Sequence, residues 1–366
     1  MNPTNNQIVS PPNQEDALYA IAFSMLPGIG TLNKNKLLKY YKSAKNIYQY
    51  KNSRQAEWPL NAAENELKFI KKNGIQCFTN FSQNYPNRLT QIPDAPTVLY
   101  LKGSNAFNLP QLISIVGTRQ ATFQVNKVIT ELIEGLSHLK MGVISGMALG
   151  VDGIAHETAL KNKLPTWGVL AHGLDQMYPY QHRKLATEML ATGGLITECG
   201  EKTITMPFQF PKRNRIVAGM SDATIVIESD LSGGSMITAK LASGYDREVF
   251  AVPGKIHDIK SKGCLWLVKN HIAQLYHDPV HLLENMNWPI ASIDHHSNTE
   301  IKEQAMIKLK APENAVYQLI QTQGPLHLDS LSDLMNLEKG ELAVYLLSLE
   351  IHGLIHLQAG NRYCCS

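Results

Sequence analysis

Short apolar runs alternate with stretches of helical spacing along the middle of the chain, between residues 110 and 280. Runs of four to six residues suit buried strands, and the longer stretches between them suit helices. Continuous apolar strands joined by helices are typical of a parallel sheet that is covered on both faces. We therefore predict an α/β fold, with an extended Rossmann-like parallel sheet domain over residues 85–288. The predicted strands are 112–117, 142–145, 167–171, 194–197, 223–228 and 248–252.

The segment before the sheet is predicted to be helical. Residues 17–25 are apolar, the sequence Leu-Pro-Gly-Ile-Gly at 26–30 interrupts the helix, and helical spacing then resumes. Pro and paired Gly between two helices are typical of a tight hairpin, which can present backbone N–H groups to a phosphate. We predict a small helical domain of the helix-hairpin-helix or SAM-like kind over residues 15–84. Residues 1–14 are polar and rich in Pro and Asn, so we expect a disordered leader and not a signal peptide.

The last segment follows a polar linker that we place at residues 289–310. Three helical stretches come next, and then two short strand-like runs with Gly360 and Asn361 at the turn between them. Three helices and a β-hairpin describe a winged helix, which we predict over residues 311–366.

Composition sets limits on this picture. A chain of 366 residues that is 44% hydrophobic and 18% charged can bury a large core divided over two or three domains. Its apolar runs all fall short of the roughly 20 residues that span a bilayer, so we expect no membrane association. The five cysteines form no Cys-x-x-Cys pair, and a reducing cytoplasm fits them best.

The charge is distributed unevenly, although the formal net charge of +3 argues against a histone-like, strongly basic protein. Between residues 31 and 80, ten Lys and Arg against three Glu give a local charge of +7. A solvated lysine face explains such a run, and nonspecific attraction of phosphate is the alternative. Residues 301–366 carry five basic and seven acidic residues, a local charge of −2, which favours a protein-contact module over a reader of duplex DNA.

The loops that follow the predicted strands hold informative residues, because ligands of such sheets bind beyond the carboxyl ends of the strands. These loops bring Gly together with hydroxyl groups or a cation, an arrangement that suits an anion at a helix N-terminus. The arginine of the first loop can add a bidentate phosphate contact. Without a Gly-x-Gly-x-x-Gly or Walker motif, neither a standard dinucleotide site nor a P-loop is supported. The candidate residues are Gly117, Thr118 and Arg119, then Ser145, Gly146 and Gly150, and then Gly233, Gly234 and Ser235.

A further candidate lies in the stretch MPFQFPKRNR at residues 206–215. It joins two aromatic residues to a run of cations and an amide. Aromatic faces stack bases while neighbouring cations hold phosphates, and stacking contributes about 1–3 kcal/mol per base. The competing interpretation is that the rings are core and the cations cap a helix. The residues are Phe208, Phe210, Lys212, Arg213, Asn214 and Arg215.

Catalytic and metal sites find little support in the sequence. Ser235 lacks the Gly-x-Ser-x-Gly elbow, and the sequence at His156 is not His-Glu-x-x-His. The histidines between residues 271 and 296 lack Cys or carboxylate partners at ligand spacing, so a solvated run is expected there. Asp152 and Glu198 can serve as general acid or base, but we expect them to orient loops or to pair with Arg119 or Arg215. We therefore predict no catalytic residue, no metal and no cofactor.

With these motifs in place, the chain resembles the DprA/Smf family of DNA-processing proteins. The resemblance runs from Tyr85 to about His271. Its markers, in order, are YPNRL, PTVLYLKG, IVGTRQAT, SGMALGVDGIAHETAL, LAHGLDQMYP, GGLITE, FPKRNRIVAGMSDATIVIE, SGGSMITAKLA and VFAVPG. Longer members of that family also carry a helical N-terminal domain and a C-terminal winged helix.

The resemblance implies a protein, not known as an enzyme, that binds and protects single-stranded DNA. It also implies that the protein hands this strand to the RecA recombinase during natural transformation, and that it forms a homodimer through the sheet domain. At the matching positions, the resemblance implies that Arg119 binds a phosphate and that Gly146 and Gly150 shape the adjacent pocket. It implies that Phe208 or Phe210 contacts a base and that residues 212–215 line the groove for the strand. Residues 233–238, Thr238 included, would bind a further anion.

Two departures from the family pattern accompany the resemblance. Phe123 and Gln124 stand where the family has Tyr-Gly, and residues 263–272 lack its Gly-x-Asn-x-Leu-Ile pattern. The resemblance therefore does not predict the conformation near residues 263–272.

An alternative function is that of a nucleotide-phosphate-binding Rossmann enzyme of the phosphoribohydrolase kind, because residues 232–238 are similar to its Gly-Gly-x-Gly-Thr loop. The missing second glycine, and the missing Glu after the Thr, count against this alternative.

Overall fold

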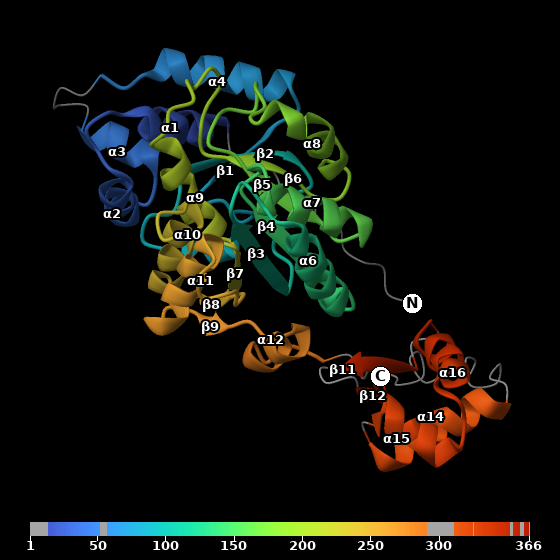
Figure 1. The fold of residues 1–366 in the computed structure, drawn as a ribbon. Helices are drawn as coiled ribbons and strands as arrows, with labels where there is room; N and C mark the ends of the chain where they lie inside the picture. The colour runs from blue at the N-terminus through green and yellow to red at the C-terminus, as the bar shows by residue number, and fades with distance from the viewer. Residues whose placement is uncertain are drawn as a thin grey trace, which may run out of the picture. The chain divides into compact units, whose positions relative to one another are not determined.

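The computed structural model describes residues 14–51, 57–290, 311–324, 326–351, 354–358 and 362–365. The chain divides into two units, Met1–Pro289 and Ile290–Ser366, and each is considered by itself (Figure 1). Nearly all of the expected leader and linker lies outside the described residues. None of the described helices is long and apolar enough to cross a lipid bilayer.

The first unit is built on one sheet, in which nine strands of the described residues take the order β1-β2-β6-β5-β4-β3-β7-β8-β9. The strands are β1 (Gln76–Thr79), β2 (Val98–Gly103), β3 (Gln111–Gly117), β4 (Met141–Ser145), β5 (Thr166–Val169), β6 (Gly194–Thr197), β7 (Ala223–Ile227), β8 (Glu248–Ala251) and β9 (Gln274–Leu275). From β6 to β9 neighbouring strands are parallel, whereas β1 and β2 extend the β6 edge in antiparallel orientation. All the predicted strands are present, and the predicted α/β fold is confirmed. The sequence pattern does not predict β1, β2 and β9.

Helices cover both faces of this sheet, as unbroken apolar strands require (Figure 1). The helices are α5 (Asn87–Thr90), α6 (Phe123–Leu136), α7 (Val151–Lys161), the 3₁₀ helix η1 (Tyr180–His182), α8 (Arg183–Met189), α9 (Gln209–Gly219), α10 (Gly234–Gly244), α11 (Ile259–Lys269) and α12 (Pro279–Asn285). Ile113 and Ile115 of β3 pack with α6, α7 and α12, whereas Leu112 and Val116 pack with α5, α9, α10 and α11. This division follows the two-residue period of a strand.

Four helices of the described N-terminal residues pack on the β1–β2 edge of the sheet. They are α1 (Gln14–Met25), α2 (Thr31–Tyr41), α3 (Ala44–Lys51) and α4 (Leu60–Lys72). Ile21, Phe23 and Leu38 share one apolar core with Val98 and Tyr100 of β2. The helical layer and the sheet therefore form one unit, and the sheet begins at β1, before the expected boundary at residue 84.

In its described residues, the second unit consists of three helices and an antiparallel sheet of order β10-β12-β11. Its elements are α14 (Ala311–Gln323), β10 (Leu326–His327), α15 (Leu328–Met335), α16 (Lys339–Ile351), β11 (Ile355–Gln358) and β12 (Arg362–Cys365). Val316, Leu331 and Leu346 contribute to its core. β11 and β12 pair as the predicted hairpin, while Gly360 and Asn361 at its turn lie outside the described residues. The winged-helix assignment of this unit stays a prediction.

Candidate functional site

The loops that follow β3, β4 and β7 meet at the carboxyl edge of the sheet, where the strand order reverses between β3 and β7. The backbone N–H of Thr118 donates to the carbonyl oxygen of Glu228 over 2.7 Å, and that of Val151 donates to Thr118 over 3.2 Å. The Glu228 carboxylate accepts from both the N–H and the hydroxyl of Thr122. Because ligands of open α/β sheets bind in the crevice at this point, the structure places the predicted loops around a candidate site.

Glycines in these loops permit close contacts within the chain. Gly150 has a φ of +77°, and a Cβ there would lie 2.4 Å from the carbonyl oxygen of Thr118. A Cβ on Gly117 would lie 1.9 Å from the carbonyl oxygen of Ile227. Gly117 therefore allows the ends of β3 and β7 to approach, and Gly150 allows two loops to approach, which differs from the expectation that these glycines make room for an anion. Gly234 at the start of α10 is open, since a Cβ there would meet nothing within 4 Å.

Hydroxyl groups among the candidate residues are buried and bonded within the protein. Ser145 donates to the carbonyl oxygen of Ile115 over 2.6 Å, and the Oγ atoms of Ser235 and Ser229 lie 2.7 Å apart. Thr238 is 2% exposed, and its hydroxyl bonds to a carbonyl of its own helix. Ser145, Ser235 and Thr238 thus support the loops with their side chains, which corrects the expectation that these hydroxyls face an anion.

Arg119, Phe210 and Tyr178 line a pocket at the same edge. Arg119 is exposed, and its Cζ lies 5.5 Å from the centroid of the half-buried Phe210 ring, within the range of a cation–π contact. The Tyr178 ring meets Phe210 edge to face at a centroid distance of 5.9 Å. Residues 146–149 and 170–172 contribute to the pocket wall. An aromatic face beside an exposed cation can stack a base and hold a phosphate.

The four polar residues of α9 do not share one surface, which corrects the expectation of a groove lined by all of them. α10 packs against α9, and so do α5 and β5, so residues on different sides of this helix are buried. Arg213 and Arg215 are only 6% and 5% exposed, whereas Lys212 is exposed and Asn214 is half-buried. Phe208, just before the helix, is 65% exposed. Of these three cations, Lys212 is the exposed one.

Arg213 supports the pocket from beneath. Its Nη1 donates to the carbonyl oxygens of Gly146 and Val169, at the ends of two neighbouring strands. Asp152 lies against the guanidinium and accepts the backbone N–H of Ala148 over 3.2 Å, so the prediction that Asp152 orients a loop is confirmed. Burial lowers the pKa of Arg213 to about 10, which leaves the guanidinium charged at neutral pH. Burial raises the pKa of Asp152, while the charge of Arg213 opposes that rise.

Glu198 forms ion pairs with the other two cations of α9, Arg215 and Lys212. Arg215 Nη2 donates to Glu198 Oε2 over 2.6 Å, and Lys212 Nζ lies 3.6 Å from Glu198 Oε1. Asp94 Oδ2 lies 3.9 Å from Arg215 Nε. The predicted pairing of Glu198 with Arg215 is confirmed. The exposed Lys212 pair is the weaker of the two, so Lys212 can exchange this carboxylate for a phosphate.

The loop after β5 supplies pocket residues that the sequence reasoning missed. His172 is buried, and its Nε2 accepts the backbone N–H of Tyr178 over 3.1 Å. This bond anchors the turn that presents the Tyr178 ring to Phe210. The signal that could have identified Tyr178 is the Tyr-Pro pair in the stretch LAHGLDQMYP, which directly follows a predicted strand.

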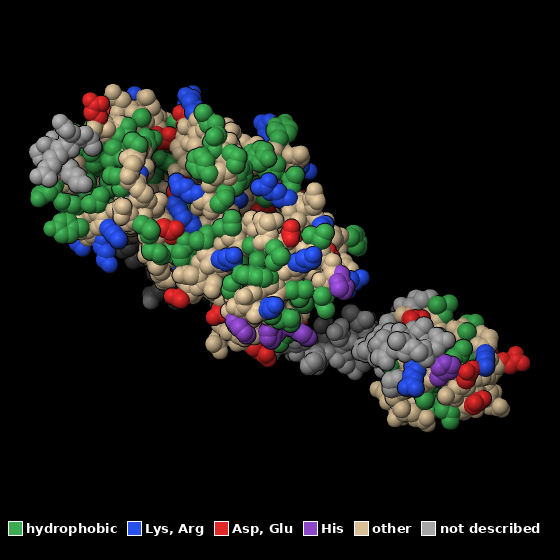
Figure 2. Space-filling view, turned by 60° about the vertical axis from the view of Figure 1, so that its left-hand side comes forward, with side chains coloured by type: hydrophobic (Ala, Val, Ile, Leu, Met, Phe, Trp, Pro, Cys, Tyr) green, Lys and Arg blue, Asp and Glu red, His purple; other side chains and the backbone are tan. Residues whose placement is uncertain are grey.

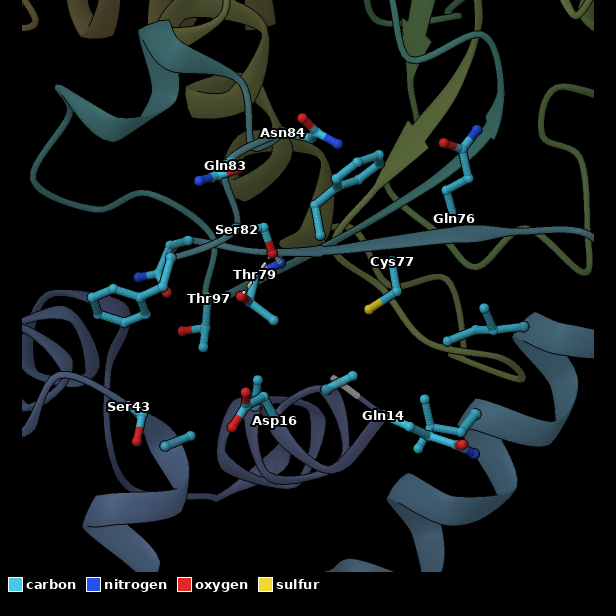
Figure 3. A pocket seen from close by; sticks show the side chains of 18 of the residues that line it. Gln14, Asp16, Ser43, Gln76, Cys77, Thr79, Ser82, Gln83, Asn84 and Thr97 are labelled. Carbon is cyan, nitrogen blue, oxygen red and sulfur yellow. Dashed lines mark hydrogen bonds between the residues drawn. The ribbon is translucent and has the colours of Figure 1, made fainter. Parts of the chain in front are cut away.

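A larger hollow, of about 820 Å³, lies away from this edge between the N-terminal helices and β1 (Figure 3). β1 contributes Cys77 and Thr79 to one side, and α1 contributes Asp16 to the facing side. Burial raises the pKa of Cys77 to about 12, so its thiol is neutral. Lys42 and Lys71 are the cations among the described lining residues. This hollow shares no lining residue with the pocket at the carboxyl edge of the sheet.

Charge at the surface is dispersed. On the face of the first unit seen in Figure 2, Lys and Arg side chains lie among hydrophobic ones. Within the described ranges, no group of three His, Cys, Asp or Glu side chains is placed to hold a metal ion. His295 and His296 of the predicted solvated run lie outside those ranges.

Comparisons with known proteins agree on one family. The family model described as DNA recombination-mediator protein A matches residues 76–287. Protein Smf of Escherichia coli is 33% identical over 233 residues, which are 63% of this chain and 62% of that protein. The chain thus spans less than two thirds of the length of this relative.

Two solved structures are similar to this chain over part of its length. The X-ray structure of DNA processing protein A from Streptococcus pneumoniae has a TM-score of 0.64 at 29% identity, covering 73% of this chain and 97% of that one. A structure on the single-stranded DNA binding mode of DNA processing protein A from Helicobacter pylori has a TM-score of 0.53 at 28% identity, covering 58% and 95%.

The family match takes in more than half of the chain. It includes every strand from β1 to β9, and with them Arg119, Tyr178, Phe210 and Lys212 of the candidate site. The chain belongs to the DNA recombination-mediator protein A family.

Proposed function

We propose that this protein binds single-stranded DNA at the carboxyl edge of its sheet and acts as a recombination mediator. In this proposal it protects incoming DNA and loads the RecA recombinase during natural transformation, in the cytoplasm and as a homodimer through the sheet unit. One observation carries the proposal: the Arg119 guanidinium stands 5.5 Å from the Phe210 ring at the ligand-binding edge. Family membership supports it, as does the Helicobacter pylori relative, whose structure concerns single-stranded DNA binding.

The pocket suggests how a strand is held. A base can stack on Phe210 or Tyr178, while Arg119 and Lys212 hold the phosphates on either side of it. The open start of α10 at Gly234 adds backbone N–H groups and the positive end of the helix dipole. These contacts go to ring faces and phosphates, which every sequence offers. Binding should therefore tolerate any base sequence and weaken with salt.

The test compares Arg119→Ala with Lys127→Ala, which removes an exposed cation from α6, outside the site. Binding of a fluorescent oligonucleotide is measured by anisotropy at several salt concentrations. Arg119→Ala should weaken binding about tenfold or more, and reduce the slope of log K against log salt by about 0.7 for each lost phosphate contact. Lys127→Ala should match the wild type.

A second variant separates stacking from charge. Phe210→Leu should weaken binding while it leaves the salt slope unchanged, because it removes a ring and no cation. Unchanged affinity in both Arg119→Ala and Phe210→Leu would refute the proposed site. Release of free base from nucleoside monophosphates would instead favour the phosphoribohydrolase-like alternative.

RecA loading and dimer formation need their own measurements. Purified RecA is added to strand coated with this protein, and filament growth is compared with growth on bare strand. Sedimentation of the free protein reports its oligomeric state. A monomer that binds DNA but leaves filament growth unchanged would confine the function to strand protection.

A further inference from the structure

A cleft beside α9 separates the start of α2 from the sheet. Two adjoining hollows, of about 550 and 220 Å³, form this cleft, and Gly30, Thr31 and Lys212 line both of them. Arg215 lines the first hollow and Glu198 the second. The cleft therefore brings the Pro-Gly turn of the N-terminal helices against the helix that carries Phe210.

The start of α2 supplies unused donors to this cleft. Gly30 is the N-cap, with an extended backbone, and in the described structure no side chain caps the helix. The first turn of α2 contains no acidic residue. The first N–H groups of a helix have no acceptor within the helix, and the helix dipole makes this end positive. An anion in the cleft would satisfy both.

Arg215 gives an independent indication of a ligand. It is 5% exposed, and its Nη1 has no hydrogen-bond partner among the described residues, although its Nη2 bonds to Glu198. A buried guanidinium N–H without an acceptor is costly, and Arg215 lines the cleft, so an acceptor bound there would lower this cost. Lys212 adds an exposed cation at the same place. Lys34, whose Nζ donates to the carbonyl oxygens of Ser24 and Leu26, also lines the second hollow. Glu198 and Asp94 supply two carboxylates against these three cations, so the cleft is not a bulk basic patch.

We infer that this cleft is a second phosphate site, which takes a phosphodiester of the single strand as it leaves the Arg119–Phe210 pocket. The inference rests on the proposed function and extends its site onto the N-terminal helices. Phe210 and Lys212 lie two residues apart in the first turn of α9, on different sides of the helix, so a strand that runs from the pocket to the cleft crosses over the start of α9. The donors would be the first N–H groups of α2, Lys212 and Arg215.

The test places a carboxylate in the cleft without weakening the helix. Thr31→Glu puts an acid in the first turn of α2, where it favours the helix and competes with phosphate. Gln49→Glu, an exposed position on α3, is the control with the same change of charge. Each variant is titrated with oligonucleotides of about six and about twenty nucleotides, which reach the pocket alone or both sites.

Thr31→Glu should weaken binding of the longer strand about tenfold, lower its salt slope by about 0.7, and leave binding of the shorter strand within about twofold. Gln49→Glu should match the wild type for both lengths. Equal behaviour of Thr31→Glu and Gln49→Glu on the longer strand would overturn the inference. Failure of the wild type to bind either length would instead refute the proposed function itself.

Inorganic phosphate distinguishes a strand site from a site for a free anion. If phosphate raises the melting temperature of the wild type but not of Thr31→Glu, while the two bind the longer strand equally, the cleft takes a free anion. That result would overturn the assignment to the strand. Competition by phosphate for the longer strand in the wild type, reduced in Thr31→Glu, would support it.

Discussion

Arg213 is a buried cation on which the shape of the candidate pocket depends. Its guanidinium bonds to the carbonyl oxygens of Gly146 and Val169 and lies against the Asp152 carboxylate. Arg213→Met keeps much of the side-chain volume but leaves Asp152 buried without its counter-charge. We expect the free energy of unfolding, measured in urea, to fall by about 3–5 kcal/mol.

Lys212→Met is the matched control for Arg213→Met, because the same substitution falls on the exposed neighbouring residue. The free energy of unfolding should change by about 0.5 kcal/mol or less, while DNA affinity decreases. Adding Asp152→Asn to Arg213→Met should restore part of the lost stability, because the amide carries no charge. Equal stabilities of the two Met variants would show that the buried pair does not support the fold.

We expect His156 to make the stability of the sheet unit depend on pH. It is fully buried; its Nδ1 lies 2.6 Å from Thr166 Oγ1, and its Nε2 has no partner among the described residues. Burial, with a smaller contribution from the charges of His182 and Arg213, lowers the pKa of His156 to about 3. Below pH 6.5 His156 therefore binds a proton in the unfolded chain but stays neutral in the folded chain.

Above pH 6.5 His156 is neutral in both the folded and the unfolded chain, and the free energy of unfolding has its full value. It falls as the pH decreases from 6.5 toward 3, because only the unfolded chain is protonated in this range. We expect a loss of about 1.4 kcal/mol per pH unit in that window, measured by urea unfolding between pH 7 and pH 4.5. His156→Asn should remove this slope, whereas replacing the exposed His257 by Asn should keep it. Parallel pH profiles of wild type and His156→Asn would contradict the assignment.

At the scale of elements, burial explains which strands the sequence predicts. A strand covered on both faces must be apolar at every position, so β3, β4 and β7 stand out in the pattern. β1, with the sequence Gln-Cys-Phe-Thr, lies at an edge and is only partly buried. Its pairing with β2, and that of β2 with β6, depends on contacts distant in sequence, which a local pattern does not contain.

Helix α9 shows how far the sequence predicts the candidate site. The sequence correctly places cations beside aromatic residues, because composition alone carries that signal. It does not separate the buried Arg213 and Arg215 from the exposed Lys212, since this depends on which elements flank α9 in space. The contact of Phe210 with Tyr178 escapes prediction for the same reason, because Phe210 lies on α9 and Tyr178 in the loop after β5.

The turn between β4 and α7 allows a prediction at the same scale. Gly150→Ala would strain a backbone with φ +77° and bring a Cβ within 2.4 Å of the carbonyl oxygen of Thr118. The strain alone should cost about 1–3 kcal/mol. Relief of the clash must move the loop that carries Arg119, so DNA binding should weaken about tenfold.

Gly244→Ala is the control for this loop, because a Cβ there meets nothing within 4 Å and the residue ends α10. It should leave DNA binding unchanged and stabilise the protein by up to about 1 kcal/mol. Urea unfolding and anisotropy on both variants check the two effects. Normal DNA binding by Gly150→Ala would show that the position of Arg119 does not depend on this contact.

For the whole molecule, net charge is a poor guide to where DNA binds. The sum of +3 combines +7 in residues 31–80 with −2 in residues 301–366 and −2 in the rest of the chain. The candidate site itself uses a few placed cations, Arg119 and Lys212 above all, and each stands beside an aromatic ring or a helix start. The acidic second unit has the wrong sign for a phosphate backbone, so strand binding should belong to the first unit.

A chain shortened to residues 1–290 tests this division. It keeps every element of the sheet unit, together with Trp288, which packs against the core beneath α6, α7 and α12. Its affinity for a single strand should stay within about threefold of the full chain, a change below about 1 kcal/mol, because every proposed contact is retained. Anisotropy at several salt concentrations should give the same slope for both chains. Arg119→Ala should cause the same loss of affinity in the shortened and the full chain. A tenfold loss of affinity on shortening alone would mean that the second unit contributes contacts to the strand despite its charge.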